Sequence, residues 1–267
     1  MKYDYHVHTH LSDDAQTPME TMVQKALALG LNELCFTDHI DYGVKTDDGP
    51  PERRNCDCWL YFQELADIRR RFGDKITVKA GMEFGIQPHT IPQFQKIFDM
   101  YEFDFIILSN HQVDDLEFWS QDFQKGKTQE EFQRRYYEQI YEVMNLYHDY
   151  SILGHLDMIK RYDLVGPYPD EKILDIIERI LRLAIKEGKG IEVNTSCYRY
   201  QLPDLTPSRK ILELYHELGG EILTLGSDAH RPEDLADQIE NVKPILRQIG
   251  FRSICTFTKM TPEFHAL

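Results

Sequence analysis

Short strand-like runs alternate with longer helix-like stretches along the whole chain, and this alternation restricts the possible folds more than any other sequence feature. The short runs are rich in β-branched and aromatic residues, whereas the stretches between them carry apolar residues at helical spacing. Strands are predicted at residues 2–8, 33–37, 76–83, 103–109, 151–154, 190–194, 221–226 and 251–257. Helices are predicted at residues 17–29, 58–72, 91–99, 129–148, 170–187, 207–218 and 232–248. The sequence therefore predicts seven strand–helix units and a trailing strand.

Residues at the predicted helix ends support this assignment. Thr17-Pro18 and Thr206-Pro207 are typical of an N-cap followed by proline at the first helical position. Gly30, Gly188 and Gly219 stand where helices should end. We therefore expect most helix boundaries to lie close to these residues.

Regular strand–helix alternation around one core predicts a parallel sheet, which is either open and doubly wound or closed into a barrel. No G-x-G-x-x-G motif follows the first strand, which argues against an open dinucleotide-binding sheet. We favour a barrel of about seven strands. The 267 residues can bury a large core, and we expect residues 1–267 to form a single domain.

Charge and composition exclude several classes of partner. A net charge of −15 repels nucleic acid backbones, and no run of apolar residues is long enough to span a membrane. The N-terminus has no apolar leader pattern, and the 5 cysteines are scattered and odd in number, which is typical of reduced thiols in a cytosolic protein. The sequence therefore predicts a cytoplasmic protein with a small-molecule partner, and it does not indicate an oligomeric state.

Histidines gather at one edge of the predicted sheet. Of the 11 histidines, six lie at or just after the carboxyl end of a strand: His6, His8, His39, His111, His155 and His230. Glu83 and Asp228 occupy equivalent positions. Barrel enzymes assemble their active sites at this edge, so we expect these side chains to meet.

The spacing of His6 and His8 predicts a shared direction for their side chains. Residues two apart in a strand point to the same face, so both imidazoles can chelate one cation, and a carboxylate from another strand can complete the site. Asp13 and Asp14 follow on the next loop, within reach of the same edge. His10 would share this face only if the strand continued past His8.

Each of these residues also has an ordinary structural interpretation. A single strand histidine is most often a hydrogen-bonded core residue, Glu83 could pair with a lysine such as Lys79, and Asp228 could cap the following helix. Separate structural roles for single residues do not readily explain why six histidines all lie at strand ends. The metal interpretation is therefore favoured.

Two arginines lie on the same predicted edge. Arg161 follows the fifth strand and Arg199 follows the sixth. One guanidinium group can bind two phosphate oxygens at once, so arginines beside metal ions indicate a phosphorylated substrate. Either residue could instead form an ion pair on a solvated loop. No G-x-S-x-G motif or cysteine nucleophile with an available base is evident.

The ordered motifs "HVHTHLSDD", "FTDH", "GMEFG", "SNH", "GHLD" and "GSDAH" resemble those of the polymerase and histidinol phosphatase (PHP) superfamily over residues 6–230. The segments "IKRY" and "EVNTSCYRY" are similar to those of its stand-alone L-histidinol-phosphate phosphatases. The resemblance implies a distorted (β/α)7 barrel. It also implies three divalent metal ions, commonly zinc, iron or manganese, at the carboxyl ends of the strands.

The resemblance assigns ligands to each ion. The first ion would be held by His6, His8, Glu83 and Asp228. Glu83 would bridge to the second ion, which His111 and His155 would also bind. The third would take Asp14, His39 and His230. The superfamily often has histidine at the position of Asp14, and Asp13 is the alternative ligand there.

The implied reaction is hydrolysis of L-histidinol phosphate to L-histidinol and inorganic phosphate, a step of histidine biosynthesis. A water between two cations would lose a proton and attack phosphorus in line, while Arg161 and Arg199 bind the phosphate. Glu83 and Asp228 would act in catalysis, with Asp228 or a bound water as the proton source for the leaving group. The alternatives are another small phosphomonoester, a phosphodiester or a nucleotide as substrate, and a non-catalytic metal-binding protein.

Overall fold

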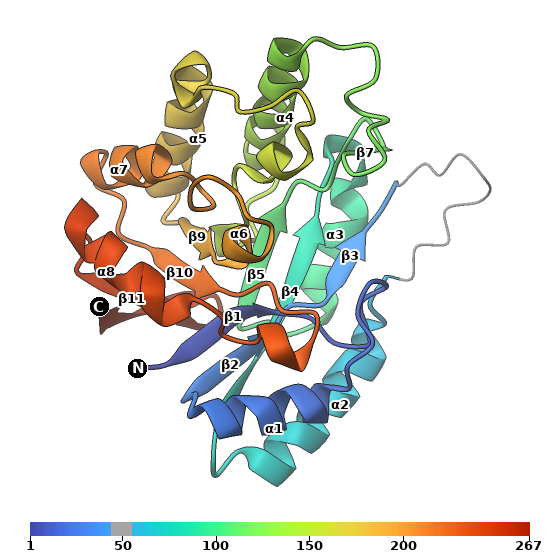
Figure 1. The fold of residues 1–267 in the computed structure, drawn as a ribbon. Helices are drawn as coiled ribbons and strands as arrows, with labels where there is room; N and C mark the ends of the chain where they lie inside the picture. Colours follow the sequence, from blue (N-terminus) through green and yellow to red (C-terminus); the bar gives the residue numbers. More distant parts are fainter. Residues whose placement is uncertain (44–54) are drawn as a thin grey trace.

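Seven parallel strands form the central sheet of the protein, in the order β1-β2-β4-β5-β8-β9-β10 (Figure 1). The computed structural model describes residues 1–43 and 55–267. The strands are β1 (Tyr3–Val7), β2 (Glu33–Phe36), β4 (Thr77–Gly85), β5 (Phe105–Ser109), β8 (Ile152–Leu153), β9 (Gly190–Asn194) and β10 (Leu223–Gly226). All seven fall within or beside the predicted strand segments.

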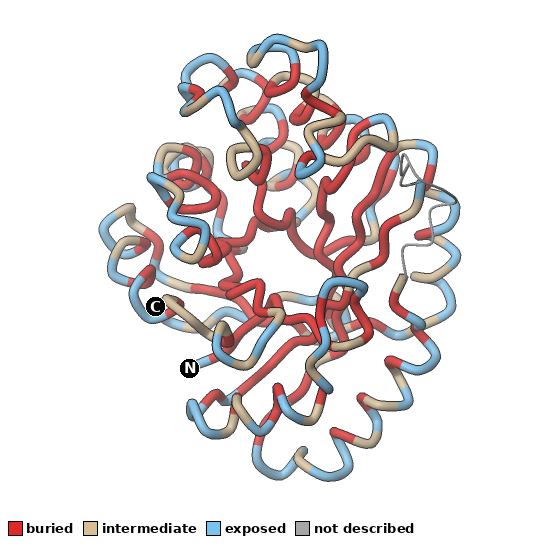
Figure 2. Tube along the Cα trace, turned by 45° about the vertical axis from the view of Figure 1, so that its right-hand side comes forward, coloured by how far each residue is buried: buried red, intermediate tan, exposed pale blue. Residues whose placement is uncertain are grey.

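The first and last strands of this order come together and nearly close the sheet into a barrel. Immediately beyond β1 and β10, the His8 amide donates to the Ala229 carbonyl at 2.9 Å, and the Ala229 amide donates to the His6 carbonyl at 3.3 Å. Figure 2 shows buried residues along the strands at the centre and exposed residues on the outer sides of the helices. The prediction of a distorted (β/α)7 barrel is confirmed.

The chain after β2 re-enters the sheet as a short additional strand, β3 (His39–Asp41). The nine-residue β4 is long enough to pair with both, because β2 runs beside its first half and β3 beside its second half. This register places His39 directly opposite Glu83. The geometry of β4 therefore brings two predicted metal ligands together.

Helices cover the outside of the barrel (Figure 1). The predicted helices correspond to α1 (Met19–Leu29), α2 (Cys58–Phe72), α3 (Ile91–Met100), α4 (Gln129–Met144), α5 (Leu174–Lys186), α7 (Arg209–Glu217) and α8 (Ile239–Ile249). Shorter segments are α6 (Ser196–Arg199) and the 3-10 turns η1 (Pro88–Thr90), η2 (Met158–Tyr162), η3 (Asp170–Lys172) and η4 (Pro232–Asp234). None of the helices in the described part of the chain is both long and apolar enough to cross a membrane.

The helix boundaries agree with the predictions at the starts of α2, α3 and α4 and at the glycines that follow α1, α5 and α7, but not at the two predicted N-caps or at the end of α4. Gly30, Gly188 and Gly219 all have positive φ angles and end their helices, as predicted. The predicted N-caps are wrong, because the cap of α1 is Pro18 and that of α7 is Ser208. Near α7, the carbonyl of Thr206 accepts a hydrogen bond from the amide of Asn194 on β9. This contact keeps Thr206 outside the helix.

The last predicted strand does not join the barrel. It forms β11 (Ser253–Thr258), which pairs antiparallel with β12 (Thr261–Ala266). The Phe257 amide donates to the Tyr5 hydroxyl at 2.8 Å, and the Met260 amide donates to the Asp104 carbonyl at 2.9 Å. This hairpin therefore lies at the amino ends of the strands. A second small hairpin is formed by β6 (Gln112–Val113) and β7 (Leu116–Glu117).

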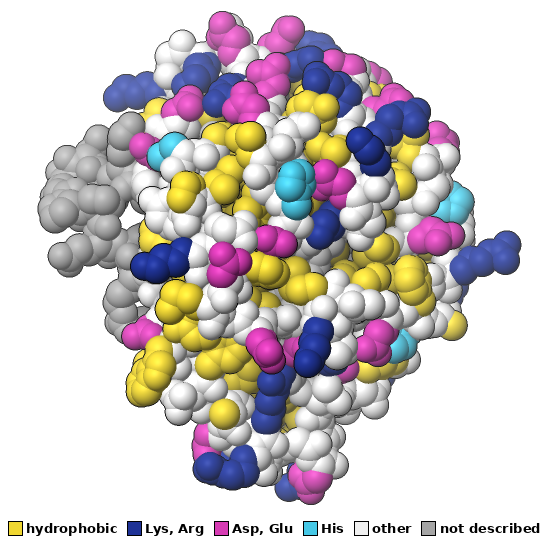
Figure 3. Space-filling model, turned by 180° about the vertical axis from the view of Figure 1, so that it is seen from behind, with side chains coloured by type: hydrophobic (Ala, Val, Ile, Leu, Met, Phe, Trp, Pro, Cys, Tyr) yellow, Lys and Arg dark blue, Asp and Glu magenta, His cyan; other side chains and the backbone are white. Residues whose placement is uncertain are grey.

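The surface carries mixed charges. On the face shown in Figure 3, Lys and Arg side chains are interspersed with Asp and Glu side chains, and no continuous basic area is visible. Residues 40–58 contain two prolines, two glycines and charges of both signs, which predicts either a flap over the site or a solvated loop. Residues 44–54 of this segment lie outside the described part of the chain, and residues 40–41 belong to β3.

Candidate metal centre

The predicted histidines and carboxylates converge at the carboxyl ends of the barrel strands. Among the described residues, four groups of three bring their nitrogen and oxygen atoms within 4.8 Å of one another: His6, His8 and Asp228; His6, Glu83 and His155; His39, Glu83 and His111; His8, His39 and His230. Strand alternation accounts for the two histidines of the first group, because His6 lies on β1 and His8, two residues later, follows directly after the end of this strand. The prediction that these distant residues meet is therefore supported by the geometry.

Glu83 lies at the centre of this cluster and is fully buried. Five histidine nitrogens surround its two oxygens: His155 at 2.8 Å, His6 at 3.0 Å, His39 at 3.1 Å, His111 at 3.2 Å and His8 at 3.5 Å. The alternative pairing with Lys79 does not occur, because that ammonium donates to Thr258 at 2.6 Å, at the opposite end of the barrel. Glu83 thus occupies a position from which a carboxylate can bridge two cations.

Asp228 also points into the cluster and does not cap a helix. Its Oδ1 lies 3.3 Å from His8 Nε2 and 3.7 Å from His6 Nε2. The following helical turn, η4, has Arg231 at its N-cap. Asp228 has a φ angle of 57°, an unusual backbone conformation for a residue other than glycine, which is common at functional sites.

Asp14 reaches the outer histidines of the cluster. Its Oδ2 lies 3.1 Å from His230 Nε2 and 3.7 Å from His39 Nε2. Asp13 lines the same cavity, so both carboxylates are near the site. By contrast, β1 ends before His10, which pairs instead with Glu64 at 3.2 Å.

The donor set fits divalent metal ions. Among the described residues, the buried atoms His8 Nε2, His39 Nδ1 and His155 Nδ1 have no hydrogen-bond partner, since the close carboxylates of Asp228 and Glu83 do not meet the geometry of a hydrogen bond with the first two. A buried imidazole nitrogen without a partner is costly, and the first two of these face neighbouring ligand groups of the cluster. Imidazoles combined with carboxylates are the ligands of zinc, iron and manganese in proteins.

The pKa values of the cluster depend on burial and on the nearest charges. Burial lowers the pKa of both His8 and His39 to about 4, and neighbouring imidazoles contribute in each case. For His111, burial acts in the same direction but the carboxylates of Asp41 and Glu83 outweigh it and raise the pKa to about 10. Protonated imidazoles such as that of His111 thus balance the negative charge of the buried carboxylates. Metal ligation requires neutral imidazoles, and the bound cations would then supply the positive charge instead.

Two further carboxylates orient the histidine rings, and the sequence interpretation missed both. Glu192 Oε1 lies 2.7 Å from His6 Nδ1, and Asp41 Oδ1 lies 2.8 Å from His111 Nδ1. Such contacts fix the ring that presents its other nitrogen to a metal. The available signals were a glutamate within the apolar strand segment "GIEVN" and an aspartate two residues after His39.

A cavity of about 410 Å³, which we call the metal cavity, opens onto the cluster. It is lined by Asp13, Asp14, His39, His111, Trp119, His155, Met158, Arg161, Tyr162, Tyr200, Asp228 and His230. Metal-ligand candidates form one part of this lining, and aromatic side chains with Arg161 form another. The volume is sufficient for a small organic phosphate.

The side chain of Arg161, on η2, is largely enclosed in the wall of the metal cavity and is 8% exposed. Its Nη2 donates to Ser196 Oγ at 2.7 Å and lies 3.6 Å from Asp228 Oδ2. The guanidinium is centred 3.8 Å from the ring of Tyr200, close enough for a cation–π contact. Arg161 therefore occupies a fixed position that faces the cluster of candidate metal ligands.

Arg199 lies behind the cluster, on α6. Its guanidinium donates to the carbonyl of Asp228 at 2.8 Å and to that of Ser227 at 3.3 Å. Arg199 is not one of the described residues that line the metal cavity. The structure therefore places its charge against the backbone that carries Asp228.

Comparison with known proteins identifies relatives of this chain. The family model described as "PHP domain" matches residues 4–196. The histidinol-phosphatase of Lactococcus lactis is 32% identical over 97% of this chain and 95% of its own length. A crystal structure from the same organism, described as histidinol phosphate phosphatase complexed with zinc, L-histidinol and phosphate, superimposes with a TM-score of 0.86 at 31% identity and covers 98% of each chain.

The structure of a putative histidinol phosphatase from Listeria monocytogenes has a TM-score of 0.76 at 18% identity and covers 90% of this chain and 99% of its own. This similarity supports the barrel fold. The family match covers more than half of the chain, and the curated relative matches nearly all of it. The chain therefore belongs to the PHP domain family, within the group that contains the histidinol-phosphatases.

Proposed function

We propose that this protein is a histidinol-phosphatase, which hydrolyses L-histidinol phosphate to L-histidinol and inorganic phosphate in histidine biosynthesis. The observation that carries the proposal is the metal cavity itself, where a histidine–carboxylate cluster and Arg161 face one space. The L. lactis structure that superimposes on 98% of the chain is described as holding zinc, L-histidinol and phosphate.

We further propose three divalent ions, of zinc, iron or manganese, with the ligands that the family resemblance implies. The described groups of three around Glu83, Asp228 and His230 offer enough donors for several ions. When bound, these ions would lower the pKa of water to give a nucleophile near neutral pH and would neutralise phosphate oxygens. Asp14 is proposed as a ligand of the outer ion because of its contacts with His39 and His230.

The protein side chains would bind and orient the phosphate. Arg161 Nε is buried without a hydrogen-bond partner among the described residues, so it can donate to a phosphate oxygen. The ring of Tyr200 supports the guanidinium plane. Arg199 adds positive charge beside Asp228, and we retain it as a second phosphate-binding candidate.

Asp228 is proposed to handle protons during the reaction. Burial raises the pKa of its carboxyl group, but His6 and the other nearby positive charges outweigh this and hold the pKa well below its usual range. The ionised carboxylate can accept a hydrogen bond from the attacking water. A proton that passes to it along this bond would be given up readily to the leaving alkoxide, because a carboxyl group of low pKa is a strong acid. Glu83, whose pKa is similarly low, is proposed to hold the ions rather than to transfer protons.

The far part of the metal cavity suits the alcohol portion of this substrate. L-Histidinol carries an ammonium group and an imidazole ring. Trp119, Tyr162 and Tyr200 offer aromatic faces to such groups, and Asp13 adds an acidic side chain at the same cavity. We also propose a cytoplasmic location, because all 5 cysteines are free, as is usual in a reducing compartment.

The test is a kinetic comparison on metal-replete protein. We expect kcat/KM for L-histidinol phosphate to exceed that for p-nitrophenyl phosphate, AMP and bis-p-nitrophenyl phosphate.

Arg161→Ala should lower kcat/KM by roughly 100-fold to 1000-fold because it removes a charged contact to the transition state, with partial recovery in Arg161→Lys. The control is Arg247→Ala, which removes an exposed arginine on α8. Equal turnover of unrelated monoesters would remove the substrate assignment, and unchanged kinetics in Arg161→Ala would remove the role of this arginine.

A further inference from the structure

A second cavity lies directly behind one wall of the metal cavity. It also has a volume of about 410 Å³, and we call it the outer cavity. Its lining comes from residues 160–170 and 202–208. The η2 turn separates the two spaces, because Arg161 lines the metal cavity and the adjacent Lys160 lines the outer cavity.

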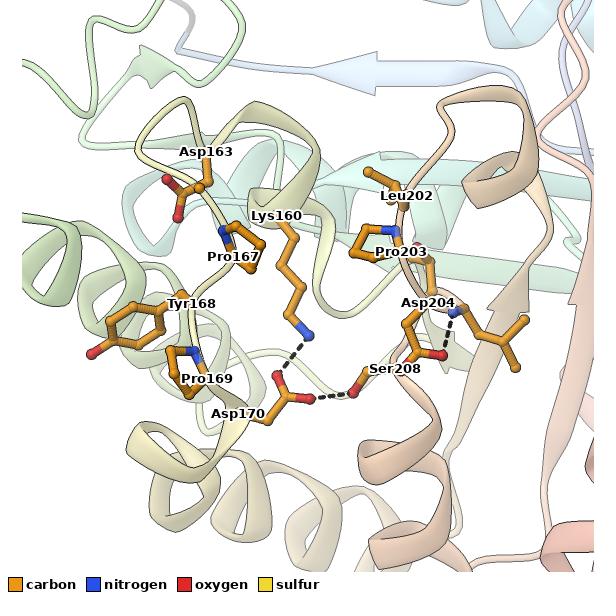
Figure 4. A pocket seen from close by; sticks show the side chains of 13 residues that line it. Lys160, Asp163, Pro167, Tyr168, Pro169, Asp170, Leu202, Pro203, Asp204 and Ser208 are labelled. Atoms are coloured by element: carbon orange, nitrogen blue, oxygen red, sulfur yellow. Dashed lines mark hydrogen bonds and ion pairs between the residues drawn. The ribbon is translucent and has the colours of Figure 1, made fainter.

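The walls of the outer cavity are mainly apolar and rigid. Figure 4 shows Pro167 and Pro169 on one side and Leu202 and Pro203 on the other, with Lys160 extending between them. Proline has a fixed φ angle, so these walls lose little conformational freedom when a ligand binds. A cavity of this size with mostly apolar walls is typical of a site for a small organic molecule.

A closed ring of polar contacts forms the floor. Lys160 Nζ lies 2.6 Å from Asp170 Oδ1 and 2.9 Å from Asp157 Oδ2. Ser208 completes the ring: its hydroxyl donates to Asp170 at 2.5 Å (Figure 4), and its amide donates to Asp157 at 3.0 Å. Two carboxylates thus share one ammonium, and the positive charge of Lys160 is already balanced.

The remaining charges of the lining are negative. Asp163 accepts hydrogen bonds from the side-chain amides of Gln129 and Gln133, and Asp204 accepts from backbone amides at residues 205 and 209. No ion pair of either carboxylate with a basic group occurs in the described part of the chain, so the lining has an excess of negative charge. Such a cavity disfavours phosphates and carboxylates and favours cations.

We propose that the outer cavity binds a small molecule with a protonated amine and an apolar or aromatic body. A ligand there would contact Lys160, so its binding would also change the position of η2 and of Arg161 at the metal cavity. An effect of this movement on catalysis rests on the proposed function, whereas binding of the amine to the outer cavity does not. The outer cavity would then be a regulatory site for phosphate hydrolysis.

The experiment measures binding of 2-phenylethylamine to the metal-replete protein by calorimetry and ligand-observed NMR. The matched probes are 2-phenylethanol, which lacks the charge, and 3-phenylpropionate, which reverses it. We expect the amine to bind and the two matched probes to bind more weakly by about tenfold or more. The alcohol cannot form a charge-assisted hydrogen bond to the carboxylates of the lining, and 3-phenylpropionate is repelled by their negative charge. Equal binding of all three would overturn the proposal.

Variants locate the site. Leu202→Trp fills the outer cavity and should abolish amine binding, whereas Leu164→Trp changes an exposed residue outside the lining and should leave binding unchanged. Asp204→Asn should weaken binding. If the amine still binds to Leu202→Trp and is displaced by L-histidinol, it occupies the metal cavity and the proposal is wrong.

A kinetic measurement tests the coupling to Arg161. Saturating amine should change KM for the phosphomonoester by more than about twofold in the wild type and leave KM unchanged in Leu202→Trp, since a conformational coupling requires binding at the distant site. Binding without any change in KM would show that the outer cavity is a site without regulation. Absence of activity towards L-histidinol phosphate would contradict the proposed function but leave the binding result intact.

Discussion

At the scale of single residues, the metal-ligand candidates could be identified from the sequence, but the residues that support them could not. His6 and His8 were identifiable because strand alternation fixes their direction without any knowledge of tertiary contacts. Glu192 and Asp41 act through contacts with histidines 186 and 70 residues away, respectively. No local pattern distinguishes such carboxylates from other strand and loop acids.

Glu192 carries a prediction of its own. It accepts from the His155 amide at 2.9 Å and contacts His6 Nδ1 at 2.7 Å, so Glu192→Gln places an amide group against these donors. We expect zinc affinity to fall by roughly 10-fold to 100-fold, as for other residues that orient metal ligands. Titration of metal-free protein against a competing chelator measures this.

The control for this variant is Glu217→Gln, which makes the same change at an exposed position of α7. Its zinc affinity should equal that of the wild type. If Glu192→Gln also binds zinc with wild-type affinity, the contact with His6 does not orient a ligand.

At the scale of elements, the alternation of strands and helices is a local signal, and it predicted the seven strand–helix units. Elements defined by other parts of the fold were missed. The three residues of β3 are too few for a periodic pattern, and β12 forms only because β11 turns back at the base of the barrel. The predicted helix at 129–148 ends at Met144, because the amides of Leu146 and Tyr147 both bond to the Val143 carbonyl in a closing turn.

Three neighbouring strands meet at Glu33, which is buried at the start of β2. The hydroxyl of Tyr5 on β1 donates to it, and Lys79 on β4 lies 3.9 Å away. Burial raises the pKa of Glu33, and these two contacts only partly oppose that effect. The folded state therefore binds a proton at Glu33 more readily than the unfolded state does.

This pKa shift predicts how stability depends on pH. The unfavourable cost of ionising Glu33 is absent below its ordinary pKa and increases as pH rises through the raised folded-state pKa. In Glu33→Gln this cost is absent, so the free energy of unfolding of the variant relative to the wild type should increase from pH 4 to pH 7. Urea unfolding at several pH values measures the difference, with exposed Glu102→Gln as control. A difference that is constant or falls with pH would contradict the prediction.

At the scale of the whole molecule, the cluster of candidate metal ligands connects most of the barrel. Its candidate ligands lie on β1, β3 and β4 and at the ends of β5, β8 and β10. These elements come from both halves of the chain, and β1 and β10 are the two strands whose contact nearly closes the barrel. Metal ions at this position would therefore link the strands across the closure as well as serve the reaction.

Removal of the ions should consequently lower the melting temperature of the entire protein. A ligand present at 1000 times its Kd stabilises the folded state by about 4 kcal/mol, which for a chain of this length corresponds to a change in Tm of roughly 10 °C. Differential scanning calorimetry before and after chelation should show this decrease, and added zinc should reverse it. Glu83→Gln, which alters the central carboxylate, should bind less metal and show a smaller response to chelator. If metal analysis shows complete removal while Tm is unchanged, the ions do not stabilise the barrel, and their role would be confined to the reaction.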